Sequence, residues 1–157
     1  IRPILPEDES LLVDFHKTLS ERTVFLRYLQ PMMLQDRVMH ERLSRICHSD
    51  YDREITLVVE GKNKEGQPSI LGVGRLSKVH GTNEARFSVL ISDAYQNIGI
   101  GAELLRRAIS VARDEKMQVI TATVTADNQP MRKLFEKAGF TAEPDSNKQV
   151  AHVRLEL

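Results

Sequence analysis

The residues from Leu90 to Leu105 carry the clearest chemical signal in the sequence. The spacing Gln-x-x-Gly-x-Gly puts glycines at positions 99 and 101, between an apolar strand-like stretch and a helical pattern. Glycine lets the backbone approach a ligand closely, because no Cβ stands in the way. A helix start adds unpaired N–H groups and the positive end of the helix dipole. The segment therefore suits a phosphate or pyrophosphate, although such a glycine pair can also serve only to relieve a tight turn.

The elements around this turn follow from the period of the apolar residues. Strands are predicted at residues 55–60, 69–79 and 84–91, and short polar turns join them into an antiparallel meander. A helix over residues 103–116 then leads to a buried strand at 119–124. Because that strand follows a crossover helix, it should run parallel to the strand before the glycine turn.

The two ends of the chain complete the predicted fold. Residues 1–4 read as an edge strand, and helical spacing follows at residues 9–19, 24–29 and 38–46. Asp127 or Asn128 is expected to cap a further helix, which Gly139 ends. Phe140 and residues 150–157 give a final strand or strand pair.

Composition limits the classes of function. The 157 residues suit a single domain over 1–157, and 22 basic residues balance 22 acidic ones, which argues against a nucleic-acid partner. Cys47 is the one cysteine, so no internal disulfide forms and a cytoplasmic location is expected. No apolar run is long enough to span a membrane. The five histidines show no metal-ligand spacing, so no metal is expected.

The strand order, the Gln96 to Gly101 turn, and Asn128 followed by Ala138-Gly139-Phe140 resemble the GNAT family of N-acetyltransferases. The resemblance implies an α/β (α+β) fold. Its mixed, mostly antiparallel sheet has about six to seven strands, helices on both faces and a splayed central parallel pair. Residues 1–8, Arg27-Tyr28 and especially residues 50–54 resemble the protein-acetylating GNAT domains, which in bacteria are often fused to an NDP-forming acyl-CoA synthetase-like region. The chain is therefore expected to be one domain of a longer polypeptide.

The resemblance implies acetyl-CoA as the acyl donor and a set of residues that bind it. A bulge near Leu90 is expected to open the gap for the cofactor. Met131 and Phe135 fit a cofactor channel and an ordinary helix core equally well. The expected cofactor-binding residues are Leu90, Ile91 and Ser92 for the pantetheine arm, Gln96, Asn97, Ile98, Gly99, Ile100, Gly101 and Ala102 for the pyrophosphate, and Asn128, Met131 and Phe135 for the channel.

Catalysis departs from the family pattern at two positions. In the protein-acetylating relatives a Glu-Phe pair supplies a base on the strand before the turn, and here the pair is Arg86-Phe87. Glu84 lies on the same strand face, roughly 7 Å away, and is the candidate base acting through water; it also fits a surface residue paired with Arg86. Phe135 stands where many members have a tyrosine acid. His80 is the alternative base among the histidines.

An acidic cluster at Asp50, Asp52 and Glu54 could attract a lysine side chain, or be loop acids partly neutralised by Arg53. The leading hypothesis is acetylation of a protein lysine, with an acyl-CoA synthetase as one possible acceptor. Two alternatives stay open: an acetyl-CoA sensor without turnover, motivated by Arg86 and Phe135, and transfer to a small-molecule amine.

Overall fold

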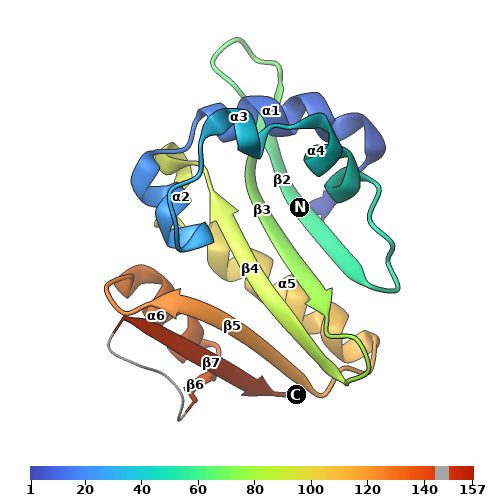
Figure 1. The fold of residues 1–157 in the computed structure, drawn as a ribbon, viewed down its shortest axis with the longest axis vertical. Coiled ribbons are helices and arrows are strands. Elements are labelled where there is room, and N and C mark those ends of the chain that lie inside the picture. The colour runs from blue at the N-terminus through green and yellow to red at the C-terminus, as the bar shows by residue number, and fades with distance from the viewer. Residues whose placement is uncertain (144–148) are drawn as a thin grey trace.

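The computed structural model describes residues 1–143 and 149–157 and contains one seven-stranded sheet in the order β1-β2-β3-β4-β5-β7-β6 (Figure 1). Every neighbouring pair is antiparallel except β4 and β5, which run parallel as the crossover argument predicted. The strands are β1 (Arg2–Pro3), β2 (Glu54–Lys62), β3 (Pro68–Lys78), β4 (Glu84–Ile91), β5 (Val119–Thr125), β6 (Thr141–Ala142) and β7 (Val150–Glu156).

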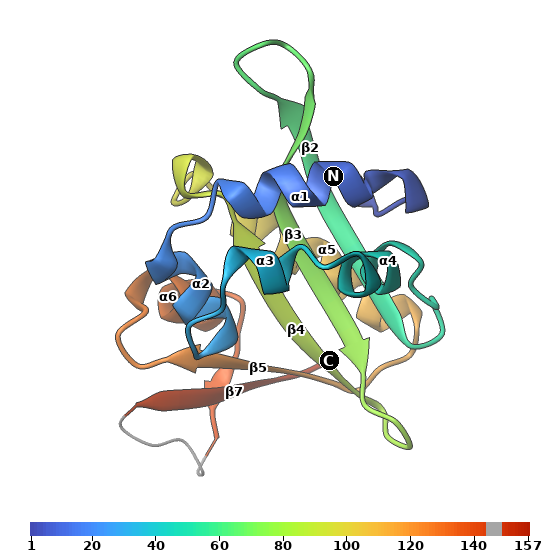
Figure 2. The same ribbon diagram turned by 45° about the horizontal axis from the view of Figure 1, so that its top comes forward.

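Helices cover both faces of the sheet. They are α1 (Glu9–Lys17), α2 (Glu21–Tyr28), α3 (Leu34–Arg37), α4 (His40–Cys47), α5 (Ile100–Asp114) and α6 (Gln129–Lys137), with 3-10 turns η1 (Pro6–Asp8) and η2 (Asp93–Tyr95). Figures 1 and 2 show α1, α3 and α4 crossing one face and α5 lying behind the other. No helix in the described ranges has the length and apolarity needed to cross a membrane.

Two apolar cores form because strand side chains alternate between the faces. The first joins Phe87 of β4 to Leu105 of α5, Ile120 of β5 and Phe135 of α6. The second joins Leu90, three residues further along β4, to the opposite face, where α1 and α4 pack. The face toward α1 to α4 therefore carries the even-numbered side chains of β4.

The central parallel pair separates after a short contact. β4 and β5 pair only from Glu84–Val119 to Arg86–Thr121, whereas β4 stays on β3 up to Ile91 and β5 stays on β7 up to Thr125. The predicted splay is confirmed, and Figure 1 shows the two strands diverging. The prediction of a bulge near Leu90 is wrong for the β3–β4 ladder, because its register runs without a shift. The one register shift between β2 and β3 lies at Val59/Glu60 of β2. The right-handed twist of two well-paired strand pairs is enough to part them.

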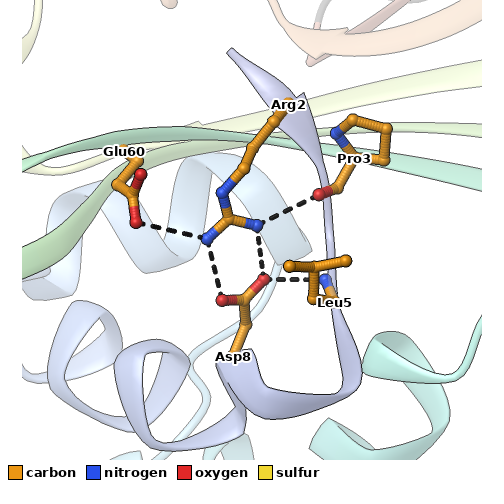
Figure 3. A network of polar contacts seen from close by, with 5 residues as sticks. All are labelled: Arg2, Pro3, Leu5, Asp8 and Glu60. Atoms are coloured by element: carbon orange, nitrogen blue, oxygen red, sulfur yellow. Dashed lines mark hydrogen bonds and ion pairs between the residues drawn. The ribbon is translucent and has the colours of Figure 1, made fainter.

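A polar network fixes the chain start to the sheet (Figure 3). The Arg2 guanidinium donates to both carboxylate oxygens of Asp8 at 2.7 and 2.8 Å and lies 3.5 Å from Glu60. The backbone N–H of Leu5 donates to the same Asp8 carboxylate at 2.7 Å. The Arg2 contact holds the pKa of Asp8 below its ordinary value, although burial acts in the opposite direction. The network adds to the pairing of β1 with β2, which also holds the chain start on the sheet.

Candidate active site

A cavity of about 1680 Å³ lies where β4 and β5 part. Ligand pockets commonly occupy about 300–1,000 Å³, so the space exceeds that of one small ligand. Side chains from both sheet faces line it. Arg106, Ile109, Lys133 and Leu134 come from the side of α5 and α6, whereas Arg75, Arg86, Thr121, Thr123 and Arg154 come from the opposite face.

The glycine turn and the start of α5 form one wall of the cavity. Asn97 (φ 62°) and Gly99 (φ 97°) both adopt the left-handed conformation, and Gly99 is the N-cap of α5. No side chain in the described chain caps this helix, and Glu103 makes the first helical bond, to the Gly99 carbonyl. The N–H groups of residues 100–102 are therefore left without a helical partner. With the dipole of a 15-residue helix behind them, these N–H groups are available to an anionic ligand.

The two glycines of the turn have different roles. Gly99 needs its positive φ, and a Cβ there would meet nothing within 4 Å. Gly101 lies inside the helix, where an added Cβ would come within 3.3 Å of both Ile91 Cδ1 and Leu134 Cδ1. Gly99 therefore gives the turn its backbone shape, and Gly101 lets α5 pack closely against β4 and α6.

The expected residues of the turn do not all face the cavity. Gln96, Asn97, Gly99, Gly101 and Ala102 line it. Ile98 and Ile100 do not: Ile98 is 67% exposed, and Ile100 packs over Gly72 of β3. The Gln96 side chain donates to the carbonyl of Ile91 and to Thr23 Oγ1, both at 3.0 Å. The Gln96 side chain therefore ties the turn to β4 and α2.

The β4 backbone presents alternate residues to the opening. Val79 N–H donates to the Glu84 carbonyl, and Ser92 N–H donates to the Leu71 carbonyl. Even-numbered residues of β4 therefore bond to β3, so the backbone groups of Val89 and Ile91 point toward the gap. Leu90 lines the cavity with its side chain, whereas Ser92 does not line it and donates its hydroxyl to Thr18. Sequence reasoning missed Val89; counting the alternation from the turn before Glu84 would have found it.

Helix α6 and its N-cap place three expected residues in the cavity wall. Asn128 is the N-cap, and its Oδ1 accepts from Met131 N–H at 3.4 Å. The Asn128 Nδ2 makes no hydrogen bond within the described chain. Met131 and Phe135 both line the cavity, but Phe135 is also core, with ring contacts to Phe87 and Phe140. Phe135 therefore belongs to the core and also reaches the cavity wall.

The candidate bases occupy different places. Glu84 lines the cavity at the end where β4 and β5 are still paired, and its carboxylate contacts Arg154 at 3.2 Å rather than Arg86. His80 is exposed in the β3–β4 turn and is not in the cavity wall. His152 of β7 is in that wall, with its Nδ1 3.3 Å from Thr123 Oγ1. Sequence reasoning passed over His152 because its cross-strand partner is 29 residues away.

The acidic cluster lies outside the cavity wall. Asp50 and Asp52 are exposed, Asp50 is 3.9 Å from Arg53, and Glu54 forms an ion pair with Arg75. None of the three acids is among the residues that line the cavity. Arginines from α2, β3, β4 and β7 line this side instead. No group of three or more potential metal ligands occurs in the described part of the chain.

Comparison with known proteins places these features in context. Residues 23–140 match the family described as the Acetyltransferase (GNAT) family. The chain is 30% identical to Acetyltransferase PA5475 of Pseudomonas aeruginosa, over all of this chain and 83% of that protein. It is 27% identical to Acetyltransferase Pat of Mycolicibacterium smegmatis over 88% of this chain, but spans only 40% of that longer protein.

Solved structures agree with the fold. The GNAT domain of S. lividans PAT superposes with a TM-score of 0.85 at 25% identity, covering 99% of this chain and 89% of that chain. PaiA N-acetyltransferase from Thermoplasma acidophilum, solved in complex with coenzyme A, has a TM-score of 0.75 at 16% identity. That match covers 99% of this chain and 97% of the other.

Proposed function

The chain belongs to the acetyltransferase (GNAT) family, and from this premise we propose that it transfers an acetyl group from acetyl-CoA to a lysine amine of a protein. The observation that carries the proposal is the splay between β4 and β5, with an uncapped α5 N-terminus on its edge. The gap offers backbone hydrogen-bonding groups to an extended ligand, and the helix start offers N–H groups to its phosphates.

Acetyl-CoA is the acyl donor, in keeping with the family and with the coenzyme A complex of a protein of the same fold. The N–H groups of residues 100–102 would hold the pyrophosphate. The backbone of Val89 and Ile91 and the Asn128 side-chain amide would bind the pantetheine arm. Arg106 and Lys133, which line the cavity from α5 and α6, would lie on the phosphate side.

Substitutions at Asn128 can separate its proposed role in acetyl-CoA binding from its role as the N-cap of α6. Asp retains an oxygen that caps α6 but removes the Nδ2 donor, so we expect Asn128→Asp to weaken acetyl-CoA binding about tenfold while stability stays within about 0.5 kcal/mol. Asn128→Ala should lose the same affinity and about 1 kcal/mol of stability as well. Calorimetric titration and urea unfolding measure the two effects. Equal affinity in wild type and Asn128→Asp would contradict the cofactor role.

A protein acceptor is supported by the resemblance of residues 50–54 to protein-acetylating domains and by the surface beside the cavity. Large apolar side chains of the α2 to α4 region are exposed, namely Phe25, Leu29, Met33, Leu34 and Met39. Leu29 also lines the cavity. Exposed apolar side chains grouped beside a site are typical of a protein-binding surface. An acyl-CoA synthetase, free or fused to this domain in the cytoplasm, is our proposed partner.

The chemistry requires a neutral amine, which attacks the thioester carbonyl, forms the C–N bond and expels the thiolate. The Val89 N–H faces the gap and is our candidate donor to the developing oxyanion. Glu84 or His152 would take the ammonium proton, directly or through water. Phe135 has no proton to give, but a thiol with a pKa near 8.5 leaves without strong assistance.

The direct test is transfer of labelled acetyl from acetyl-CoA to an acyl-CoA synthetase and to a histone-like substrate, read by mass spectrometry. Gly99→Asp is a suitable test variant, because it brings a negative charge to the start of α5, and the backbone strain at this left-handed position is shared by Asp and Asn. Gly99→Asn is its neutral match. The proposal is supported if wild type labels lysines of the protein substrates and if Gly99→Asp lowers that labelling far more than Gly99→Asn does. Labelling of small amines alone would contradict the protein acceptor.

Arg86 motivates a second candidate function. It occupies the position of the family's expected glutamate, and a domain without an effective base could bind acetyl-CoA as a sensor. Calorimetry and a thiol-release assay on wild type and Arg86→Glu distinguish the two. Binding without turnover in wild type, with turnover gained in Arg86→Glu, would favour the sensor function.

A further inference from the structure

The cavity is strongly cationic on the side where the acceptor would enter. Among the described residues that line the whole cavity, nine are arginine or lysine and three are acidic. Two of the acids are already paired: Asp127 with Arg22 at 2.9 Å and Glu84 with Arg154 at 3.2 Å. A cavity with this balance favours an anionic ligand.

The sheet brings three of the arginines to one face. Arg86 of β4 is in register with Thr121 of β5, which is in register with Arg154 of β7. Arg75 of β3 is in register with Ser88, two residues along β4 from Arg86 and on the same face. Arg27 reaches the same cavity from α2, which packs against β4. These side chains come from four separate elements of the fold.

Two of these arginines have no ion-pair partner in the described chain. Arg75 is compensated by Glu54, and Arg154 by Glu84 and Glu156. Arg86 is exposed at the cavity and makes no hydrogen bond or ion pair in the described residues. Arg27 is half-buried, and its guanidinium lies 4.9 Å from the ring centroid of Tyr28.

Arg27 is held in an unfavourable environment for a cation. Burial lowers the pKa of Arg27 most, and the positive charges of Arg75 and Arg42 lower it further, whereas Tyr28 and Glu54 act in the opposite direction. An arginine nevertheless stays protonated in proteins. A partly buried guanidinium beside other cations is costly, and an anion in the cavity would relieve that cost.

We propose that Arg27 and Arg86 form an acceptor subsite for a carboxylate that lies next to the amine to be acetylated. The planar guanidinium fork matches a carboxylate and binds it in a charge-assisted, often bidentate manner. The subsite proposal depends on the proposed acetyl transfer in one respect: the acceptor amine must enter the cavity from the face that carries these arginines.

The same charges help the reaction in a second way. A lysine ammonium near several guanidinium groups is repelled, so its neutral, nucleophilic form is favoured. A neighbouring carboxylate on the acceptor compensates the arginines during binding. Arg86 in place of a glutamate then disfavours the ammonium through its charge and does not accept the proton.

The carboxylate has two possible sources: an acidic residue beside the target lysine in a protein, or the α-carboxylate of a free amino acid. Peptides with Asp or Asn beside a single lysine measure the first source. Free amino acids and their amides measure the second. For each pair, the acid-to-neutral ratio of kcat/KM is compared in wild type, Arg86→Gln and Arg27→Gln. Lys64→Gln, which removes an exposed cation in the turn between β2 and β3, outside the cavity, is the matched control.

We expect wild type and Lys64→Gln to favour the acid-containing member of one pair about tenfold, and each cavity variant to bring that ratio close to one. Arg27→Lys, which keeps the charge, guards against misfolding of Arg27→Gln and should retain part of the preference. An acid-to-neutral ratio near one in wild type would overturn the proposal. So would a tenfold ratio that survives when Arg27→Gln and Arg86→Gln are combined in one protein. A preference among free amino acids alone would assign the subsite to a small-molecule acceptor.

Equilibrium binding separates this proposal from the proposed function. Fluorescence anisotropy of the Asp and Asn peptides on the CoA-loaded protein reports the subsite without turnover. Tighter binding of the Asp peptide that disappears in Arg86→Gln, with no acetyl transfer to any amine, would support the subsite and refute the transferase. Equal binding of both peptides and of both members of each amino acid pair would refute the subsite, whatever the activity.

Discussion

Replacing Asp8 with alanine is expected to lower the free energy of unfolding by about 3 kcal/mol. The Asp8 side chain is 5% exposed and accepts two hydrogen bonds from Arg2 and one from the Leu5 N–H. Alanine would leave a partly buried guanidinium and a backbone donor without their acceptor, and such groups are costly when the partner alone is removed. The effect should appear as a lower urea midpoint with an unchanged m-value.

Two control experiments accompany the Asp8→Ala prediction. Asp14→Ala removes a 72% exposed carboxylate 3.9 Å from Lys17 and should change stability by less than about 0.5 kcal/mol. Arg2→Ala combined with Asp8→Ala should cost less than the sum of the single changes, because both partners are then absent. A loss below about 1 kcal/mol for Asp8→Ala would show that the network of Figure 3 is not stabilising.

The pH dependence of this contribution has a definite sign. Because the pKa of Asp8 is lowered in the folded protein, the unfolded chain binds the proton more readily. The stabilisation is fully present above the ordinary carboxylate pKa. It is lost as the pH falls from there through the lowered folded value. Asp8→Ala should therefore be less sensitive than wild type to acid in that range.

Local sequence signals were sufficient for the fold and for the backbone shape of the glycine turn. Periodicity and turn residues predicted the three-stranded meander, and the crossover rule predicted the parallel pair. Gly99 has the left-handed φ that a turn at this junction requires. Helix α5 begins at Ile100 rather than Glu103, because the helical backbone starts at the glycine turn, before the first charged residue. Helix α3 was missed, since four residues are too few for a period.

The set of residues on the acceptor side of the cavity depends on the register between strands that are far apart in the sequence. No local sequence pattern reports that register. Arg86 and Arg154 share a face because both are in register with Thr121, yet 68 residues separate them in the chain. The ion pair of Glu84 with Arg154 and the ion pair of Glu54 with Arg75 arise in the same way. Sequence proximity suggested the pairing of Glu84 with Arg86 and an acidic rim at 50–54. The sheet geometry gives an arginine-lined cavity instead.

His152 is the site residue for which we expect the largest effect on turnover: His152→Gln should lower kcat about 100-fold. His152 lines the cavity and is in register with Thr123, which lies beyond Thr121, the last β5 residue paired with β4. It therefore lies beside the open part of the splay, where an attacking amine has room. Imidazole is well suited to accept a proton at neutral pH. Glu84 lies instead at the closed end, in an ion pair.

Glutamine is the matched substitution at both positions, since it keeps a polar side chain and removes the base. We expect Glu84→Gln to change kcat less than fivefold, whereas His152→Gln should lower kcat and leave acetyl-CoA binding unchanged. Steady-state kinetics from pH 5 to 9, with acetyl-CoA binding measured alongside, separate a lost base from a lost cofactor site. A 100-fold loss of kcat in Glu84→Gln alone would instead identify Glu84 of β4 as the base. Small losses in both variants would mean that the arginine-lined cavity delivers a neutral amine and that no protein base is required.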